Sequence, residues 1–130
     1  MARYGGIDLG GTKIQAVVVD EAHEVLGSAR HPTPATGGPA DVTLAMVGAV
    51  REALDTAGVG AGELSAIGVG SPGVVDDAAG TVTSARNLPD WEGTYPLGEK
   101  LETALDAPVT LSNDVNVATQ AEFDLGAAKP

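Results

Sequence analysis

The sequence predicts an α/β domain whose sheet is antiparallel at first and parallel later. Two apolar segments, the second of them rich in β-branched residues, flank a glycine pair near the start, which is typical of a hairpin. Apolar residues then recur at helical spacing, and short apolar strands alternate with helices to the end of the sequence. The expected order is β-β-β-α-β-α-β-α, a mixed sheet with helices packed on it. At 130 residues the chain suits one domain or one half of a two-domain protein, but not two full domains.

The first elements are three strands. The first two are expected over residues 4–9 and 13–20, joined by a glycine turn in which a positive φ causes no Cβ clash. A third strand is expected over residues 24–30. Proline, glycine and threonine predict a loop over residues 31–39, so His31 is expected to be a solvated loop residue.

The middle of the chain predicts a helix, a buried strand and a small hairpin. Asp41 is the expected N-cap of the helix, which ends at Gly58. Residues 66–70 are expected to form a short, glycine-rich buried strand, and residues 74–83 a hairpin around an acidic turn.

The last third predicts a loop, a helix, a strand and a final helix. The loop is expected over residues 86–95 and the helix over 97–105. The strand is expected over 109–112, and the final helix from Asn113 or Asp114 to Gly126.

Composition excludes several classes of protein. The net charge is −11 and the seven basic residues are isolated, which argues against a surface that binds nucleic acid or an anionic membrane, because no Lys/Arg cluster exists to pair with phosphates. No apolar run is long enough to span a bilayer, and no signal peptide is expected at the start, so the expected location is the cytoplasm. Without cysteine, these residues offer no disulfide, thiolate metal site or thiol nucleophile.

The first motif is Asp8-Leu9-Gly10-Gly11-Thr12-Lys13. Its glycines allow backbone N–H groups to approach an anion, Thr12 adds a hydroxyl donor and Lys13 a positive charge. Asp8 at the end of the strand can hold a Mg²⁺-bound water beside a polyphosphate. The alternative is a plain tight hairpin; the acid before the glycines and the Thr-Lys after them favour phosphate binding.

The second motif is Asn113-Asp114-Val115-Asn116, where a strand gives way to a helix. Ligands of open α/β sheets lie at the carboxyl ends of strands. Asn113 can bind sugar hydroxyls, and Asp114 can accept the proton of an alcohol that attacks a phosphoryl group. The alternative is an N-cap without chemistry.

Two further segments carry polar groups beside apolar ones. Ser71-Pro72-Gly73 ends a buried strand, and Asn87-Leu88-Pro89-Asp90-Trp91 places an amide near an indole, a combination that suits a sugar ring. The alternatives are a simple turn for the first segment and a loop anchored to the core by Trp91 for the second.

Taken together, these motifs resemble the N-terminal half of the ROK (repressor, open reading frame, kinase) family of sugar kinases, with its bacterial glucokinases most similar. The resemblance covers the whole chain and rests on DLGGTK at 8–13, GVGSPG at 68–73, NLPDW at 87–91 and NDVNVATQAEFDLGAA at 113–128. It implies the ribonuclease H-like fold of the actin-like ATPases. It also implies phosphoryl transfer from ATP and Mg²⁺ to a hexose, most simply to the 6-hydroxyl of glucose, a step of glycolysis.

The resemblance also implies roles for individual residues. Asp114 matches the catalytic base and also lies at the sugar, where Asn113, Asn87 and Gly73 match sugar-binding positions. The first phosphate loop matches Asp8, Gly10, Gly11, Thr12 and Lys13. Asp8 would reach Mg²⁺ through a water molecule.

The family's second phosphate loop, its Glu/His sugar ligands, its cysteine-rich zinc motif and its adenosine pocket come after the point where this sequence stops. We therefore expect residues 1–130 to be one N-terminal lobe, without a zinc site, inactive alone and prone to form a homo-oligomer.

Other functions are compatible with the same motifs. The domain could be the sugar sensor of a ROK-type transcriptional repressor, but these proteins carry a helix-turn-helix ahead of the fold and none is expected here. A scaffold of the same superfamily would need neither the base nor the phosphate loop. N-acetylmannosamine, fructose or mannose could replace glucose, and polyphosphate could replace ATP.

Overall fold

The structure is a computed structural model that describes residues 2–10, 12–22, 24–34, 37–60, 62–71, 74–76, 78–83 and 93–112. Within these residues the strands of the main sheet are β1 (Arg3–Leu9), β2 (Lys13–Asp20), β3 (Val25–Pro32), β4 (Leu64–Gly70) and β8 (Val109–Ser112). The smaller sheet contains β5 (Val74–Asp76), β6 (Thr81–Thr83) and β7 (Thr94–Tyr95). The helices are α1 (Gly38–Ala57) and α2 (Leu97–Leu105).

The main sheet is mixed and has the order β3-β2-β1-β4-β8. β1, β2 and β3 are antiparallel neighbours, whereas β4 runs parallel to β1 and β8 parallel to β4. This arrangement confirms the predicted change from antiparallel to parallel pairing. The change in direction follows from the connections between the strands. Short turns join antiparallel strands, whereas a strand parallel to its neighbour needs a crossover connection, here a helix, before it.

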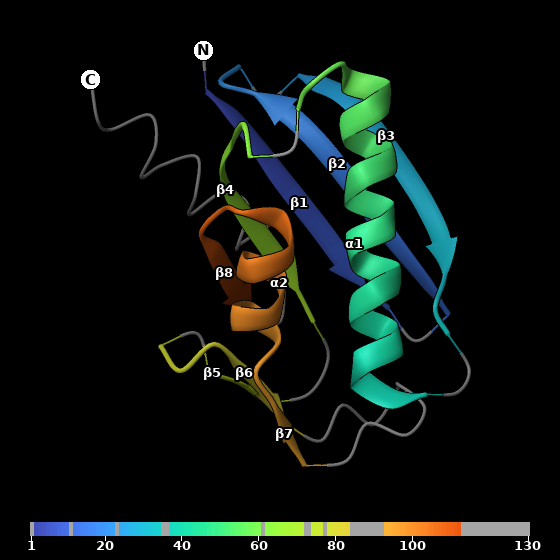
Figure 1. The fold of residues 1–130 in the computed structure, drawn as a ribbon, viewed down its shortest axis with the longest axis vertical. Helices are drawn as coiled ribbons and strands as arrows, with labels where there is room; N and C mark the ends of the chain where they lie inside the picture. The colour runs from blue at the N-terminus through green and yellow to red at the C-terminus, as the bar shows by residue number, and fades with distance from the viewer. Residues whose placement is uncertain are drawn as a thin grey trace.

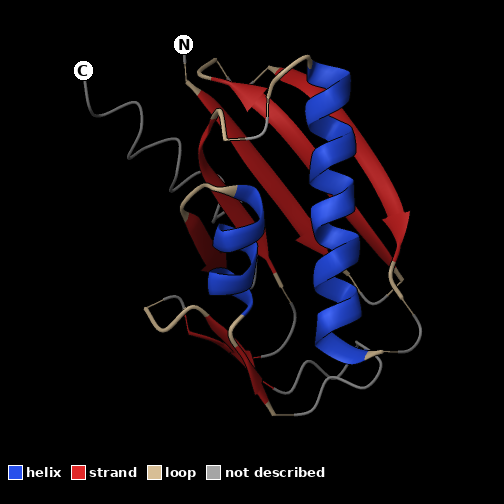
Figure 2. Cartoon of the chain, viewed as in Figure 1, coloured by secondary structure: helices blue, strands red, loops and turns tan. Residues whose placement is uncertain are grey.

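Both helices cover the same face of the main sheet, α1 over β1, β2 and β3 and α2 beside β8 (Figures 1 and 2). Alternate residues of the strands point at them and form one core, which includes the fully buried Ile7, Ile14, Ile67, Met46 and Leu101. On the opposite face a smaller cluster gathers around buried Tyr4. The sheet therefore has one face covered by the described helices, as the alternating strand pattern indicates.

Helix α1 begins earlier than predicted. Gly37 occupies the N-cap position with φ 95°, and a proline stands in the first turn, where its missing N–H costs nothing. The prediction that Asp41 is the N-cap was wrong: Asp41 lies inside the first turn, where its charge is favourable to the helix dipole. The other end was predicted correctly, because Gly58 adopts the left-handed conformation with φ 71° and closes the helix.

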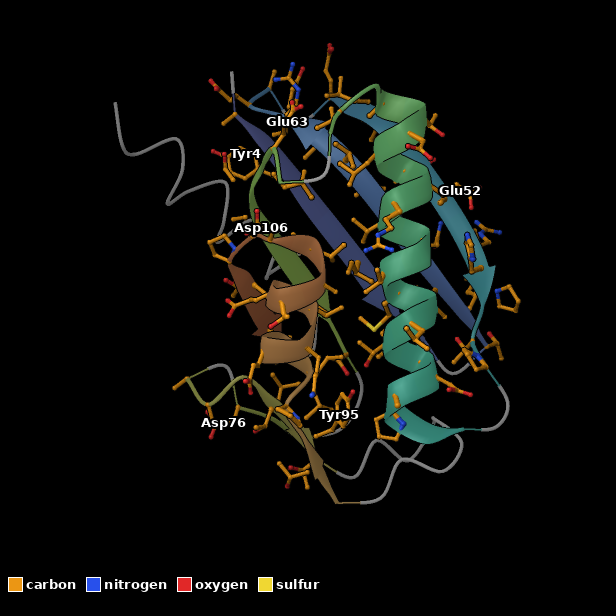
Figure 3. The ribbon with its side chains drawn as sticks, viewed as in Figure 1. Tyr4, Glu52, Glu63, Asp76, Tyr95 and Asp106 are labelled. Atoms are coloured by element: carbon orange, nitrogen blue, oxygen red, sulfur yellow. The ribbon has the colours of Figure 1, made fainter. Side chains whose placement is uncertain are left out.

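The third strand extends further than predicted, to Pro32, so the loop expected over residues 31–39 is shorter. Because β3 is the edge strand of the sheet, a proline at its end breaks no central ladder. His31 lies in this strand, and its Nε2 is 2.5 Å from Oε2 of Glu52 on α1. His31 therefore lies in a strand and not in a loop as predicted, and its side chain remains partly exposed. Figure 3 shows Glu52 projecting from the side of α1 that faces β3.

The smaller sheet lies between β4 and α2 in sequence, and the predicted element order did not include its third strand. The hairpin of β5 and β6 is confirmed, but β7 pairs with β6 inside the segment predicted to be a loop. Val82 of β6 is fully buried in the main core, and the backbone N–H of Gly98 donates to the carbonyl of Gly80 at 2.9 Å. The small sheet is thus fixed to α2.

Helix α2 and strand β8 match their predicted ranges. Asp106 caps the helix in the left-handed conformation with φ 53°. The predicted final helix, which begins at Asn113 or Asp114, lies outside the described residues. Among the helices that the structure describes, neither is long and apolar enough to cross a membrane.

Candidate functional site

The candidate site is the edge of the main sheet where the parallel strands end. Asp8 of β1 is in register with Gly70 of β4, and Gly70 with Ser112 of β8. Two strand spacings of about 4.8 Å each, roughly 10 Å in all, therefore separate Asp8 from Ser112. Carboxyl ends of parallel strands are where ligands of open α/β sheets bind.

Alternation along the strands places Asp8 on the face opposite the two helices. Its neighbours Ile7 and Leu9 are buried in the core beneath the helices, whereas Asp8 is exposed. Ser112 shares this opposite face, because Leu111 beside it belongs to the core. Gly70 stands in register between Asp8 and Ser112 and carries no side chain, so no side chain of β4 separates these two residues at this level.

The glycine hairpin adjoins Asp8. The backbone N–H of Gly10 donates to the carbonyl of Lys13 at 3.0 Å, and a Cβ at Gly10 would lie 3.0 Å from the same oxygen. Thr12 and Lys13 are exposed. Ile14 faces the core, so Lys13 points to the same face as Asp8. An anionic ligand would therefore meet one positive side chain beside a tight turn, with the Asp8 carboxylate available to a cation.

The ends of β4 and β8 are joined beyond the regular ladder. Ser71 is 2% exposed, and its backbone N–H donates to the carbonyl of Ser112 at 2.8 Å. This bond fixes the point from which the chain continues into Asn113 and Asp114. Ser112, the residue before the predicted sugar-binding and catalytic segment, therefore lies at the same edge as the hairpin.

The small sheet lies beside this edge of the main sheet. β5 follows the carboxyl end of β4 and contacts β8, and Figure 1 shows the small sheet next to the lower ends of β4 and β8. Thr83 and Thr94 are paired across β6 and β7, with their hydroxyl oxygens 2.7 Å apart. Asn87 belongs to residues 84–92, which lie outside the described residues.

Of the predicted site residues, the structure describes four and brings them together. These are Asp8, Gly10, Thr12 and Lys13. Five others lie outside the described residues, so their roles stay predictions: Gly11, Gly73, Asn87, Asn113 and Asp114.

Sequence reasoning missed one residue of the hairpin's surroundings. The hydroxyl of Thr33 donates to the carbonyl of Gly10 at 2.7 Å, and its backbone N–H donates to the carbonyl of Thr12 at 3.0 Å. Thr33 lies in the segment predicted to be a loop, and no local pattern marks it. Thr33 can be recognised as a partner of the glycine turn only once the pairing of β2 with β3 is known.

A shallow depression of about 350 Å³ lies at the other end of β8, away from the candidate site. It is lined by Glu102, Asp106, Ala107 and Pro108. The carboxylate of Glu102 already accepts the backbone N–H of Val109 at 2.9 Å. No group of three or more histidine, aspartate or glutamate residues suited to a metal occurs in the part of the chain that the structure describes.

Fold and edge together define an α/β domain of the class whose ligands bind at the carboxyl ends of parallel strands. The model of the ROK family matches residues 4–130, and the chain belongs to this family.

Similar proteins agree with this assignment. The glucokinase of Streptomyces coelicolor is 40% identical over 124 residues, which are 95% of this chain and 36% of that protein. The crystal structure of the ROK hexokinase from Thermus thermophilus has a TM-score of 0.77 at 38% identity, covering 94% of this chain and 38% of its own.

A third similar protein was solved with ligands. The ROK family glucokinase from Streptomyces griseus, in complex with glucose and AMPPNP, has a TM-score of 0.75 at 37% identity, covering 98% of this chain and 38% of its own. The chain therefore spans little more than a third of the length of the relatives it matches.

Proposed function

We propose that this chain forms the N-terminal lobe of an ATP-dependent hexose kinase that transfers a phosphoryl group to the 6-hydroxyl of glucose. The observation that carries the proposal is the shared edge, where Asp8 and the glycine hairpin lie about two strand spacings from Ser112, the residue before Asn113 and Asp114. Phosphoryl transfer depends on holding donor and acceptor in line, which requires both segments on one side of the sheet.

The proposed roles follow the chemistry of each side chain. Asp114 would accept the proton of the attacking hydroxyl, and Asn113, Asn87 and Gly73 would bind the sugar. Lys13 and the hairpin of Gly10, Gly11 and Thr12 would hold phosphate oxygens.

The donor set near the hairpin fits a magnesium nucleotide. Asp8 offers an exposed hard oxygen ligand, the kind that Mg²⁺ prefers, here through a water molecule. Bound Mg²⁺-ATP would supply the phosphoryl group and charge neutralisation. Because the reaction consumes ATP, we propose that it takes place in the cytoplasm.

We also propose that the fold is the ribonuclease H-like fold of the actin-like ATPases. The antiparallel β1, β2 and β3, followed by α1, β4, α2 and β8, support this classification. This chain covers 36% of the Streptomyces coelicolor glucokinase and 38% of the Streptomyces griseus glucokinase structure, so we propose that turnover needs residues beyond these 130.

The proposal is tested on the full-length gene product with a coupled assay of ADP release. Glucose, mannose, fructose and N-acetylmannosamine are compared as acceptors, and ATP and polyphosphate as donors. We expect glucose and ATP to give the highest kcat/KM, and residues 1–130 alone to give no turnover. Absence of turnover with every acceptor and donor in the full-length protein would contradict the proposal.

The base is tested by Asp114→Asn in the same protein. We expect kcat to fall by about 10²- to 10⁴-fold because the proton acceptor is lost, while glucose affinity by calorimetry changes little. Asp55→Asn, on the exposed side of α1, is the control and should match the unmodified enzyme. Near-normal turnover by Asp114→Asn would remove Asp114 from this role.

A further inference from the structure

Thr33 makes two hydrogen bonds to one turn. Its hydroxyl donates to the carbonyl of Gly10 at 2.7 Å, and its backbone N–H donates to the carbonyl of Thr12 at 3.0 Å. Gly10 and Thr12 flank Gly11, so a single residue beyond the end of β3 holds carbonyl oxygens on both sides of the hairpin's tip. The side chain is partly buried, which strengthens the bond relative to one in water.

These two bonds fix the direction of two peptide groups. In a trans peptide the carbonyl and the N–H of the next residue point in opposite directions, and the described residues contain no cis bond. The carbonyl of Thr12 faces Thr33, so the N–H of Lys13 points away from it. A carbonyl oxygen turned toward an anion would repel it, whereas an N–H attracts it.

A turn made of glycine needs such an external restraint. Glycine samples more backbone conformations than any other residue, and ordering it on binding costs free energy. Donors that are already oriented before the ligand arrives avoid that cost.

We infer that Thr33 is a positioning residue for the phosphate-binding hairpin, acting through the carbonyls of Gly10 and Thr12 without touching the nucleotide. The inference rests on the proposed function, because it assumes that the hairpin binds the phosphates of the donor. It predicts that loss of the Thr33 hydroxyl changes the KM for the nucleotide and leaves the KM for the hexose unchanged.

The experiment compares Thr33→Val, Thr33→Ala and Thr33→Ser with the unmodified full-length gene product. Thr33→Val and Thr33→Ala remove the hydroxyl, and we expect the KM for ATP to rise about 3- to 10-fold, as loss of one hydrogen bond predicts. The KM for glucose should stay within about 2-fold of the unmodified value. Thr33→Ser keeps the hydroxyl and should restore the KM for ATP.

Thr43→Val is the matched control. The hydroxyl of Thr43 donates to the carbonyl of Pro39 at 2.7 Å within α1, a bond of the same kind and length away from the hairpin. Thr43→Val should lower the melting temperature, as we also expect for Thr33→Val, but leave the KM for ATP unchanged. This variant separates a general loss of stability from a loss of turn geometry.

Each outcome decides the inference. An unchanged KM for ATP in Thr33→Val and Thr33→Ala, or an equal rise in the KM for glucose, would overturn it while the proposed function stands. Loss of the folded state in both variants, seen by circular dichroism, would assign the hydroxyl to folding and reject the positioning role. If the unmodified protein neither turns over nor binds AMPPNP in calorimetry, the proposed function fails and this inference fails with it.

Discussion

Asp8 shows how strand geometry exposes a polar side chain at the end of an otherwise buried strand. The residues on either side, Ile7 and Leu9, are 0% and 2% exposed, because alternate side chains of a strand face opposite sides of the sheet. The carboxylate is thereby presented on the face that the described helices leave uncovered, next to the glycine hairpin. This placement suits a role toward a cation that accompanies a phosphate.

At this scale we expect Asp8→Asn in the full-length gene product to lower kcat/KM for ATP by about 10- to 100-fold, as loss of a residue that orients a metal's ligands does. The amide keeps the size of the side chain but loses the charge, so the KM for glucose should not change. Steady-state kinetics at varied Mg²⁺ measure the effect. A variant with an unaltered Mg²⁺ requirement would show that Asp8 does not act through the metal.

At the scale of elements, the fit between β3 and α1 depends on one glycine. A Cβ at Gly27 would lie 2.3 Å from the carbonyl oxygen of Ala53 and 2.7 Å from the nitrogen of Ala57. Both atoms belong to the backbone of α1, so they cannot move aside as a side chain would. The helix therefore lies directly on the strand, and this contact holds the edge of the sheet against the core.

Gly27→Ala is accordingly expected to lower the free energy of unfolding by about 1–3 kcal/mol, the usual cost of overpacking. Gly48→Ala is its counterpart within α1, where a new Cβ would meet nothing within 4 Å. That variant should raise the free energy of unfolding by up to about 1 kcal/mol, because alanine favours the helix. Urea unfolding followed by circular dichroism measures both, and equal effects of the two substitutions would refute the close contact.

At the scale of the whole molecule, charge is the dominant surface property. The formal net charge is −11 at pH 7, with 18 acidic and 7 basic residues. Like charges at this density repel one another most strongly when the chain is compact, which opposes folding.

We therefore expect added salt to stabilise the domain. Raising NaCl from about 10 mM to about 150 mM shortens the Debye length from about 30 Å to about 8 Å, which screens this repulsion. The urea midpoint at pH 7 should increase. The control replaces sodium chloride with an uncharged osmolyte of equal osmolarity. A urea midpoint that falls with added salt would mean that attractive ion pairs outweigh the repulsion between like charges.

The sequence by itself determined the α/β class, the ranges of α2 and β8 and the glycine hairpin, because these depend on local signals: apolar period, β-branched runs and a Gly-Gly turn. It also supplied Asp8, Gly10, Thr12 and Lys13 as candidates, since their residue types already suit a phosphate. The start of α1 was missed because Gly37 and a proline in the first turn compete with Asp41 as start signals.

Only the tertiary structure decided which of these pieces meet. The register that aligns Asp8 with Gly70 and Ser112, and the bonds from Thr33 to the hairpin, join residues far apart in the chain. The pairing of β7 with β6 and the contact of His31 with Glu52 also join residues that are distant in the sequence. Such contacts leave no local pattern, because they are set by strand order and by the packing of the helices on the sheet.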